Sequence, residues 1–157
     1  MERVLAGMAG TGAEATRVPG VGAEDRVVLF DGVCVLCTAW ARFLLRVDRA
    51  GRFRLGTVQS PQGAAILAHV GLPTDTFDTI LLVEGTRVYQ RSDAVLRVFG
   101  ALPAPWRWLR GLARLPAGLR DGCYDVVARN RYRLFGQRAH CVVPSPEQAE
   151  RFLDGGR

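Results

Sequence analysis

The chain contains no lysine. All 21 of its basic residues are arginine, and against 15 acidic residues they give a formal net charge of +6 at pH 7. A basic balance favours an anionic partner such as nucleic acid or a membrane surface, but it fits a solvated arginine-rich face equally well. The charge alone therefore identifies no partner.

Long apolar runs are also missing. No stretch reaches the roughly 20 apolar residues needed to cross a bilayer, so the sequence predicts no transmembrane segment. Residues 1–25 are rich in Gly and Ala, contain Glu2 and Glu14, and lack the continuous apolar region of a signal peptide. We expect these residues to form a disordered leader and the protein to be cytoplasmic.

Cysteine and histidine are scarce, with four and two residues respectively. Cytosolic thiols stay reduced, which favours redox or metal chemistry over structural disulfides. Cys34 and Cys37 form the one close pair, whereas seventeen residues separate Cys123 from Cys141. A zinc site favours a second close pair, so this spacing does not suggest zinc but leaves a metal site open.

The hydrophobic pattern predicts an α/β domain with the order β-α-β-α-β-β-α. The first crossover predicts parallel strands, and the Glu84-Gly85 turn predicts an antiparallel hairpin. This is the element order of a thioredoxin-like mixed four-stranded sheet flanked by helices. Ser60 and Ser92 are expected to cap the second and third helices. We expect strands at 27–30, 53–58, 80–83 and 87–90, and helices at 34–50, 61–70 and 93–99.

After residue 100 the prolines become frequent, and short helical segments are expected at 106–115 and 119–129. A last short helix is expected to begin after Ser145 and to end at Leu153. There is no second core, so we predict one domain over 26–154 with a C-terminal helical appendage from about residue 101. The run Trp106-Arg107-Trp108-Leu109-Arg110 could rest on an anionic membrane surface, but a tryptophan anchor against the sheet is the simpler interpretation. The arginines and aromatic residues of 129–138 are likewise expected to pack on their own domain, which argues against a nucleic acid partner.

The pair Cys34-Val35-Leu36-Cys37 carries the strongest chemical signal. Cys34 directly follows a buried strand and a glycine turn, at the start of a helix. Helix N-termini stabilise negative charge and generally lower the pKa of thiols placed there. Cys37 lies one turn further on, nearly on the same face. We therefore predict that Cys34 attacks a disulfide and that Cys37, buried, resolves the mixed disulfide.

Three interpretations of the pair remain open: a redox dithiol, half of a metal site, and two inert buried cysteines. The redox interpretation requires no bound cofactor. It implies a protein or small-molecule disulfide as substrate and a thiol electron donor that the sequence does not specify. A non-enzymatic binding module, built on the same scaffold with a basic C-terminal region, is the alternative function.

Asp31 precedes Cys34 by three residues. A carboxylate there raises the pKa of nearby thiols through like-charge repulsion. Two roles are open for it. Asp31 could accept the proton of Cys37 during resolution, or it could shape the turn by bonding backbone N–H groups.

One signature runs through the chain from residue 27 to 153. Residues 31–37 read Asp-x-x-Cys-x-x-Cys, and further segments follow at Ser92-Asp93-Ala94, Trp106-Arg107, Tyr124-Asp125, 129–136 and Cys141-x-x-Pro144-x-Pro146-Glu147. Together they resemble the DCC family of predicted thiol-disulfide oxidoreductases. The resemblance implies a thioredoxin-related fold and protein-disulfide oxidoreductase activity.

Thioredoxins place a cis-proline just before the third strand, where the present chain has Thr79. We expect Thr79 to occupy the equivalent place and offer its backbone to substrate. Cys141 could act as a third redox thiol, although a buried apolar role is the simpler expectation. Cys123 is expected to fill the core beside Tyr124 and Val126.

Overall fold

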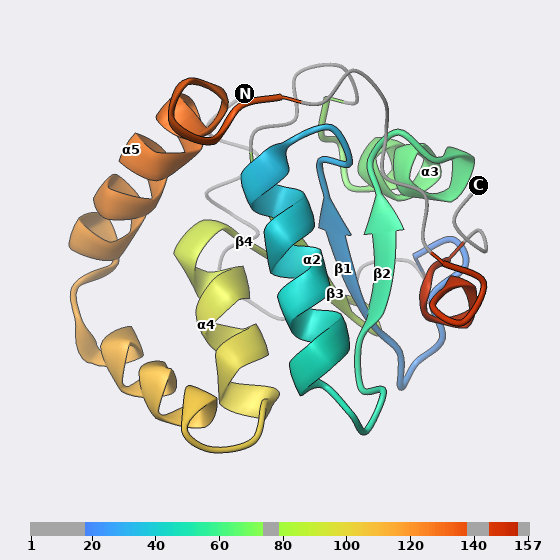
Figure 1. The fold of residues 1–157 in the computed structure, drawn as a ribbon, viewed down its shortest axis with the longest axis horizontal. Helices are drawn as coiled ribbons and strands as arrows, with labels where there is room; N and C mark the ends of the chain where they lie inside the picture. Colours follow the sequence, from blue (N-terminus) through green and yellow to red (C-terminus); the bar gives the residue numbers. More distant parts are fainter. Residues whose placement is uncertain (1–17, 74–78, 138–144, 154–157) are drawn as a thin grey trace.

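A mixed four-stranded sheet forms the centre of the protein, which we describe from a computed structural model (Figure 1). The structure describes residues 18–73, 79–137 and 145–153. The sheet order is β2-β1-β3-β4, with β1 parallel to β2 and antiparallel to β3, and with β3 and β4 forming a hairpin. This arrangement confirms the predicted α/β class and strand pairing. The strands are β1 (Arg26–Phe30), β2 (Arg54–Thr57), β3 (Leu81–Glu84) and β4 (Arg87–Gln90).

Helices cover both faces of the sheet. Side chains of α2 and α4 pack on one face, and those of α3 pack on the other. The appendage, η1 and α5, lies outside α4, and α5 also contacts α2 (Figure 1). The bounds are α2 (Val35–Val47), α3 (Pro61–His69), α4 (Arg91–Ala101), the 3-10 helix η1 (Trp106–Arg114), α5 (Ala117–Phe135) and the 3-10 helix η2 (Ala149–Arg151).

The position of β1 explains its continuous apolar sequence. Val28 and Phe30 point into the core beneath α2 and α4, whereas Val27 and Leu29 point into the core beneath α3. All four side chains are at most 1% exposed. A central strand covered on both faces has no solvent side, so period-two alternation is absent from its sequence.

Of the two serines predicted to cap helices, Ser60 does so and Ser92 does not. Ser60 caps α3, because its side chain accepts a hydrogen bond of 3.0 Å from the Gly63 amide. Ser92 caps nothing: α4 begins at Arg91, and the Ser92 hydroxyl instead donates to the Asp121 carboxylate of α5. Because Ser92 lies inside the first turn of α4 rather than before it, its hydroxyl is not at the N-cap position from which it would accept from the backbone N–H groups.

The appendage differs in detail from the prediction. Segment 106–114 is a 3-10 helix, and α5 continues to Phe135 rather than ending near residue 129. Trp106 packs edge-on against Phe43 of α2 with 4.8 Å between ring centroids and stacks on Phe99 of α4, so it anchors on the helices rather than on the sheet. No helix among the described residues is long and apolar enough to cross a membrane.

The two ends of the described chain also pack on the domain. Val18 and Val21, within the predicted leader 1–25, lie buried in the core beneath α3, while residues 1–17 are outside the described part. Near the other end, Arg151 of η2 binds the buried Asp48 carboxylate at 2.7 Å, and Phe152 packs edge-on against Phe30. The domain core therefore includes residues from both ends of the described range.

Candidate active site

Cys34 lies in the connection between β1 and α2, directly before the first residue of the helix. The strand ends at Phe30, three residues turn the chain, and Cys34 occupies the N-cap of α2 in an extended conformation. Its Sγ accepts a hydrogen bond of 3.3 Å from the Cys37 backbone N–H. The sulfur therefore sits at the positive end of the helix, where amides without helical partners and the helix dipole favour negative charge.

Both thiols are buried. Cys34 is 0% exposed and Cys37 is 8% exposed, and they are present as free cysteines. The backbone after α5 lies against Cys34, which pairs with Gln137, while the Val35 amide donates to the Gly136 carbonyl at 3.4 Å. The sequence did not anticipate this cover over Cys34. An incoming disulfide can reach the sulfur only after this local contact has opened.

Burial raises the pKa of Cys37 well above the ordinary thiol value. The hydrogen bond with Cys34 and the charge of Cys34 raise it further, and Asp31 adds a smaller effect in the same direction. The positive charge of Arg131 opposes these effects. The Cys37 thiol therefore keeps its proton at neutral pH.

Asp31 is the hub of a buried polar network. It is 4% exposed. Its Oδ1 accepts hydrogen bonds from the Gln59 side-chain amide at 2.7 Å and the Val33 backbone N–H at 3.1 Å. Its Oδ2 accepts from the Tyr132 hydroxyl and from Arg131, 3.4 Å away. These bonds include the expected turn-shaping contact, and none of these partners is a thiol.

Arg131 and Tyr132 extend this network from α5. The Arg131 guanidinium is buried against Asp31 and lies over the Tyr132 ring, 4.7 Å from its centroid. Burial raises the pKa of Tyr132, and so does its hydrogen bond to the Asp31 carboxylate. The expectation that these residues pack on their own domain is confirmed for both. The sequence did not identify Asp31 as their partner, although residues 31 and 131 both fall within the family signature.

Tyr124 connects α5 to the segment before β3. Its hydroxyl accepts a hydrogen bond of 2.8 Å from the Ile80 amide and lies 3.3 Å from Thr79 Oγ1. Burial raises the pKa of Tyr124, and the charge of Cys37 acts in the same direction. Tyr124 thus lies within electrostatic reach of Cys37 while it holds Thr79 and Ile80. Substrate docking at the Thr79 backbone stays a prediction.

The remaining cysteines stand apart from this site. Cys123 is exposed on α5, so the prediction that it fills the core is wrong. Its neighbour Tyr124 points toward the domain and turns Cys123 to the opposite side of the helix. Cys141 lies outside the described residues. Within the described ranges, no group of three or more His, Cys, Asp or Glu side chains is arranged to hold a metal ion.

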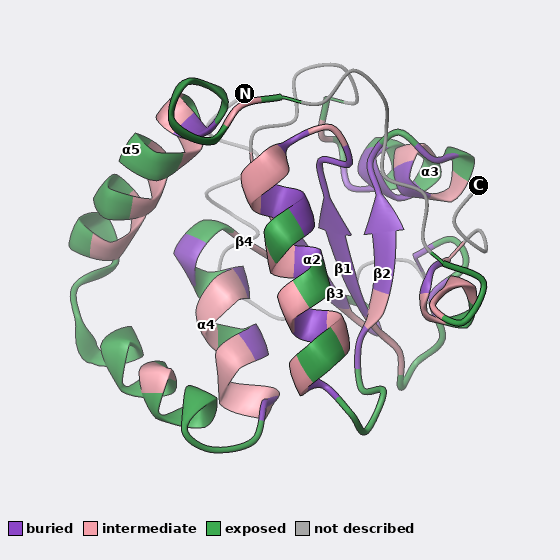
Figure 2. Cartoon of the chain, viewed as in Figure 1, coloured by how far each residue is buried: buried purple, intermediate pink, exposed green. Residues whose placement is uncertain are grey.

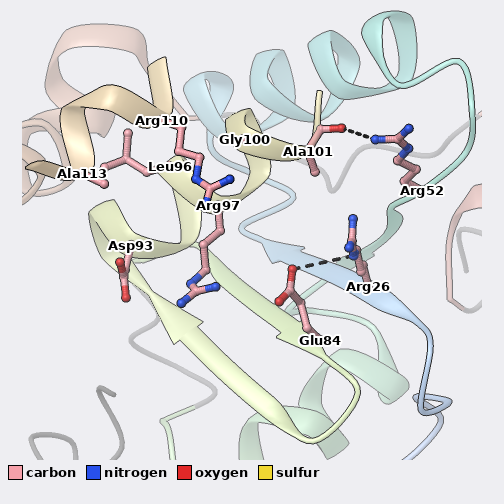
Figure 3. A pocket seen from close by; sticks show the side chains of 10 residues that line it. All are labelled: Arg26, Arg52, Glu84, Asp93, Leu96, Arg97, Gly100, Ala101, Arg110 and Ala113. Carbon is pink, nitrogen blue, oxygen red and sulfur yellow. Dashed lines mark hydrogen bonds and ion pairs between the residues drawn. The ribbon is translucent and has the colours of Figure 1, made fainter. Parts of the chain in front are cut away.

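A cavity of about 490 Å³ lies elsewhere, at the other end of β1 from Cys34 (Figure 3). Arg26 begins β1 and is paired there with Glu84, while Arg52 donates to the Ala101 carbonyl at 2.7 Å. The side chains of Arg97 and Arg110 project between these elements (Figure 3). No cysteine lines the cavity, so it is separate from the dithiol.

Comparison with known proteins identifies the family of the chain. The family model described as DCC1-like thiol-disulfide oxidoreductase matches residues 28–137, which include the last three residues of β1, both thiols and all of α5. The chain belongs to this family. Both the polar network around Asp31 and the cysteine pair lie inside the segment of this chain that the family model matches.

Two relatives extend the comparison. The chain is 40% identical over 129 residues to the uncharacterized protein YuxK of Bacillus subtilis, covering 82% of this chain and 94% of that protein. It is 35% identical over 123 residues to the DCC family protein At1g52590 of Arabidopsis thaliana, whose name describes it as chloroplastic, covering 76% and 72% of the two chains. No solved structure matches.

Proposed function

We propose that the protein is a thiol-disulfide oxidoreductase in which Cys34 attacks and Cys37 resolves. The observation that carries the proposal is the bond from the Cys37 amide to Cys34 Sγ at the start of α2. That bond places Cys34 Sγ at the helix N-terminus, the position from which a cysteine sulfur attacks a disulfide in this proposal. The family description supports a redox role for the pair.

The reaction conserves electrons through two exchanges. The Cys34 thiolate attacks one substrate sulfur, which breaks the substrate disulfide, forms a mixed disulfide and releases one substrate thiolate. Cys37 then loses its proton and attacks Cys34 Sγ, which releases the second thiolate and forms a Cys34–Cys37 disulfide. The substrate gains two electrons, and a separate thiol donor reduces the protein again. No bound cofactor enters the cycle.

Deprotonation of Cys37 is the step for which the polar network matters. The raised pKa of Cys37 makes its proton hard to remove, and the Arg131 charge offsets part of that effect. We assign Asp31 as the proton acceptor during resolution, because its charge already acts on Cys37. Its hydrogen bonds with Gln59 and Val33 hold it in place for that role.

Alkylation and turnover test the cysteine assignment. In reduced full-length protein, iodoacetamide should modify Cys34 before Cys37, and Cys123, which is exposed on α5, serves as the accessible reference. Cys34→Ser should lose reduction of insulin or of a small aromatic disulfide, and Cys37→Ser should accumulate a mixed disulfide on Cys34. If Cys34 and Cys37 react equally fast with iodoacetamide, and no Cys34–Cys37 disulfide forms under mild oxidants, the non-enzymatic binding module becomes the better account.

The role of Asp31 needs a second test with a matched control. Asp31→Asn should slow decay of the mixed disulfide by about 10²-fold or more and leave the initial attack unchanged. Gln59→Leu removes a hydrogen bond from Asp31 while keeping its charge. Equal slowing of decay in both variants would assign Asp31 to turn structure alone.

The proposal also includes a cellular compartment, and its metal-site alternative has a direct test. We place the reaction in a reducing compartment, the cytosol, where thiol donors keep the dithiol reduced. Metal analysis of the purified protein tests the alternative metal interpretation. Stoichiometric zinc that is lost on Cys34→Ser would favour a metal site over the redox cycle.

A further inference from the structure

Helix α5 contacts the domain through polar side chains and exposes large apolar ones, which is the reverse of an ordinary surface helix. Its side toward the domain carries polar groups: Asp121 binds Ser92, Asp125 pairs with Arg91, and Arg131 binds Asp31. Its other side exposes the large apolar side chains Leu119, Val126 and Leu134, which are 56%, 63% and 67% exposed, alongside Arg129 and Arg133. A surface helix normally buries its apolar stripe and shows its polar face to water. Figure 2 shows the exposed residues of α5 on the side away from the sheet.

Helix η1 also exposes large apolar side chains. Trp108 is 71% exposed, and Leu112 and Leu115 are 48% and 43% exposed. Trp106, two residues before Trp108, is the one that packs against Phe43 and Phe99. Every large hydrophobic side chain found exposed in the described ranges lies between residues 106 and 135. We call this the appendage face: Trp108, Leu112, Leu115, Leu119, Val126 and Leu134.

The segment that carries the appendage face has a strong excess of positive charge. Segment 102–137 contains seven arginines against two aspartates, which is five of the chain's six net positive charges. Both aspartates are bound to α4, away from the face. Arg107, Arg114, Arg129 and Arg133 are exposed on the same two helices. The face thus combines tryptophan, leucine and valine with arginine and no exposed carboxylate in the described part of the segment.

We propose that the appendage face docks on the surface of an anionic lipid membrane. Exposed tryptophan and aliphatic side chains insert at the boundary between headgroups and acyl chains, while arginines bind anionic headgroups. A second copy of the chain fits less well, because two such faces would bring like charges together. A nucleic acid would use the arginines but would leave the aliphatic residues Leu119, Val126 and Leu134 in water.

Co-sedimentation with vesicles tests the docking. Full-length protein should sediment with phosphatidylcholine vesicles that contain about 30% phosphatidylglycerol and remain in solution with pure phosphatidylcholine. Raising the salt from about 0.05 M to about 0.5 M should weaken binding, because the arginine contribution is screened. Trp108 fluorescence, read as the difference between wild type and Trp108→Phe, should shift to shorter wavelength on binding.

Paired variants separate the apolar from the charged contribution. Trp108→Ala with Leu134→Ala should lower the partition coefficient by at least about tenfold. Arg129→Gln with Arg133→Gln should lower it by about 25-fold, because each basic residue near an anionic surface contributes about a factor of five. Arg46→Gln with Arg49→Gln, both exposed near the end of α2, is the control and should change binding by less than about threefold.

Several outcomes would overturn the proposal. One is the absence of binding to anionic vesicles at low salt, and another is equal loss in the Arg46/Arg49 control. Tight binding to single-stranded RNA that depends on Arg129 and Arg133 but not on Trp108 would assign the face to nucleic acid. A dimer in sedimentation velocity that Leu134→Ala dissociates would assign it to a second copy of the chain.

Discussion

Helices α2 and α5 meet at the candidate site, and they use their side chains in opposite ways. α2 buries Ala41 and Leu44 against the sheet and exposes arginines such as Arg46. α5 buries Arg131 and exposes Leu134. Burial of apolar area holds α2 on the sheet, since it is favourable without directional requirements. Directional bonds to Asp31, Ile80 and Ser92 hold α5.

The difference between the two helices has consequences for the site. A buried ion pair adds little net stability, because desolvation of both charges offsets their attraction, yet removal of one partner leaves a buried charge alone. The bonds of α5 therefore fix its position more than they stabilise the fold. They bring Arg131 and Tyr124 to the thiol of Cys37, which α2 carries.

The largest expected effect comes from breaking the polar side of α5. Arg131→Met leaves the buried Asp31 carboxylate without its cation and should lower the free energy of unfolding by about 3–5 kcal/mol. Urea unfolding followed by circular dichroism measures this change. Arg133→Met, on the exposed side of the same helix, is the control and should change stability by less than about 0.5 kcal/mol. A similar small loss in both variants would refute the idea that Asp31 anchors α5.

A matched pair of leucines tests the apolar side of the comparison. Leu44→Ala on α2 opens a cavity in the core and should lower the free energy of unfolding by about 2–5 kcal/mol. Leu134→Ala on α5 removes a side chain that is 67% exposed and should change it by less than about 0.5 kcal/mol. Thermal and urea unfolding of the two variants give the values. A loss above about 1 kcal/mol in Leu134→Ala would mean that another part of the chain covers α5.

Tyr124→Phe should have an intermediate effect. It removes the acceptor of the Ile80 amide and leaves that buried N–H unsatisfied, at a cost of about 1–3 kcal/mol. Hydrogen exchange of the Ile80 amide should accelerate, because the bond that protects it is gone. Tyr89→Phe on β4 serves as the control, since it removes a hydroxyl from the neighbouring strand rather than from α5. Unchanged exchange at Ile80 would show that Tyr124 does not hold the segment before β3.

Local chemistry explains how much of the fold could be predicted. The apolar run of β1, the Ser60-Pro61 start of α3 and the Glu84-Gly85 turn each act within a few residues, so the sequence reveals them directly. The cysteine pair is visible for the same reason, since the end of β1 and the start of α2 adjoin it.

The rest of the site depends on contacts between distant residues. Asp31 and Arg131 are 100 residues apart, and nothing near either residue indicates the other. Cys34 pairs with Gln137, and the Ser92 hydroxyl donates to Asp121, in both cases across a long stretch of sequence. Helical periodicity was also misleading for Cys123, because the side of α5 that faces the domain is polar.

The smallest expected effect is a pH dependence where α2 and α5 meet. Burial raises the pKa of Cys37 in the folded protein, so the folded state holds that proton more tightly than the unfolded chain, where the thiol pKa is about 8.5. The resulting stability is complete below that pH and is lost as the pH rises above it. Between about pH 8.5 and about pH 9.5, reduced wild-type protein should lose about 1 kcal/mol more than Cys37→Ser. Urea unfolding at both pH values, under a reducing agent, measures the difference. Parallel losses in the two proteins would mean that Cys37 ionises as easily folded as unfolded, so that the charge of Arg131 fully offsets the effect of burial on the Cys37 pKa.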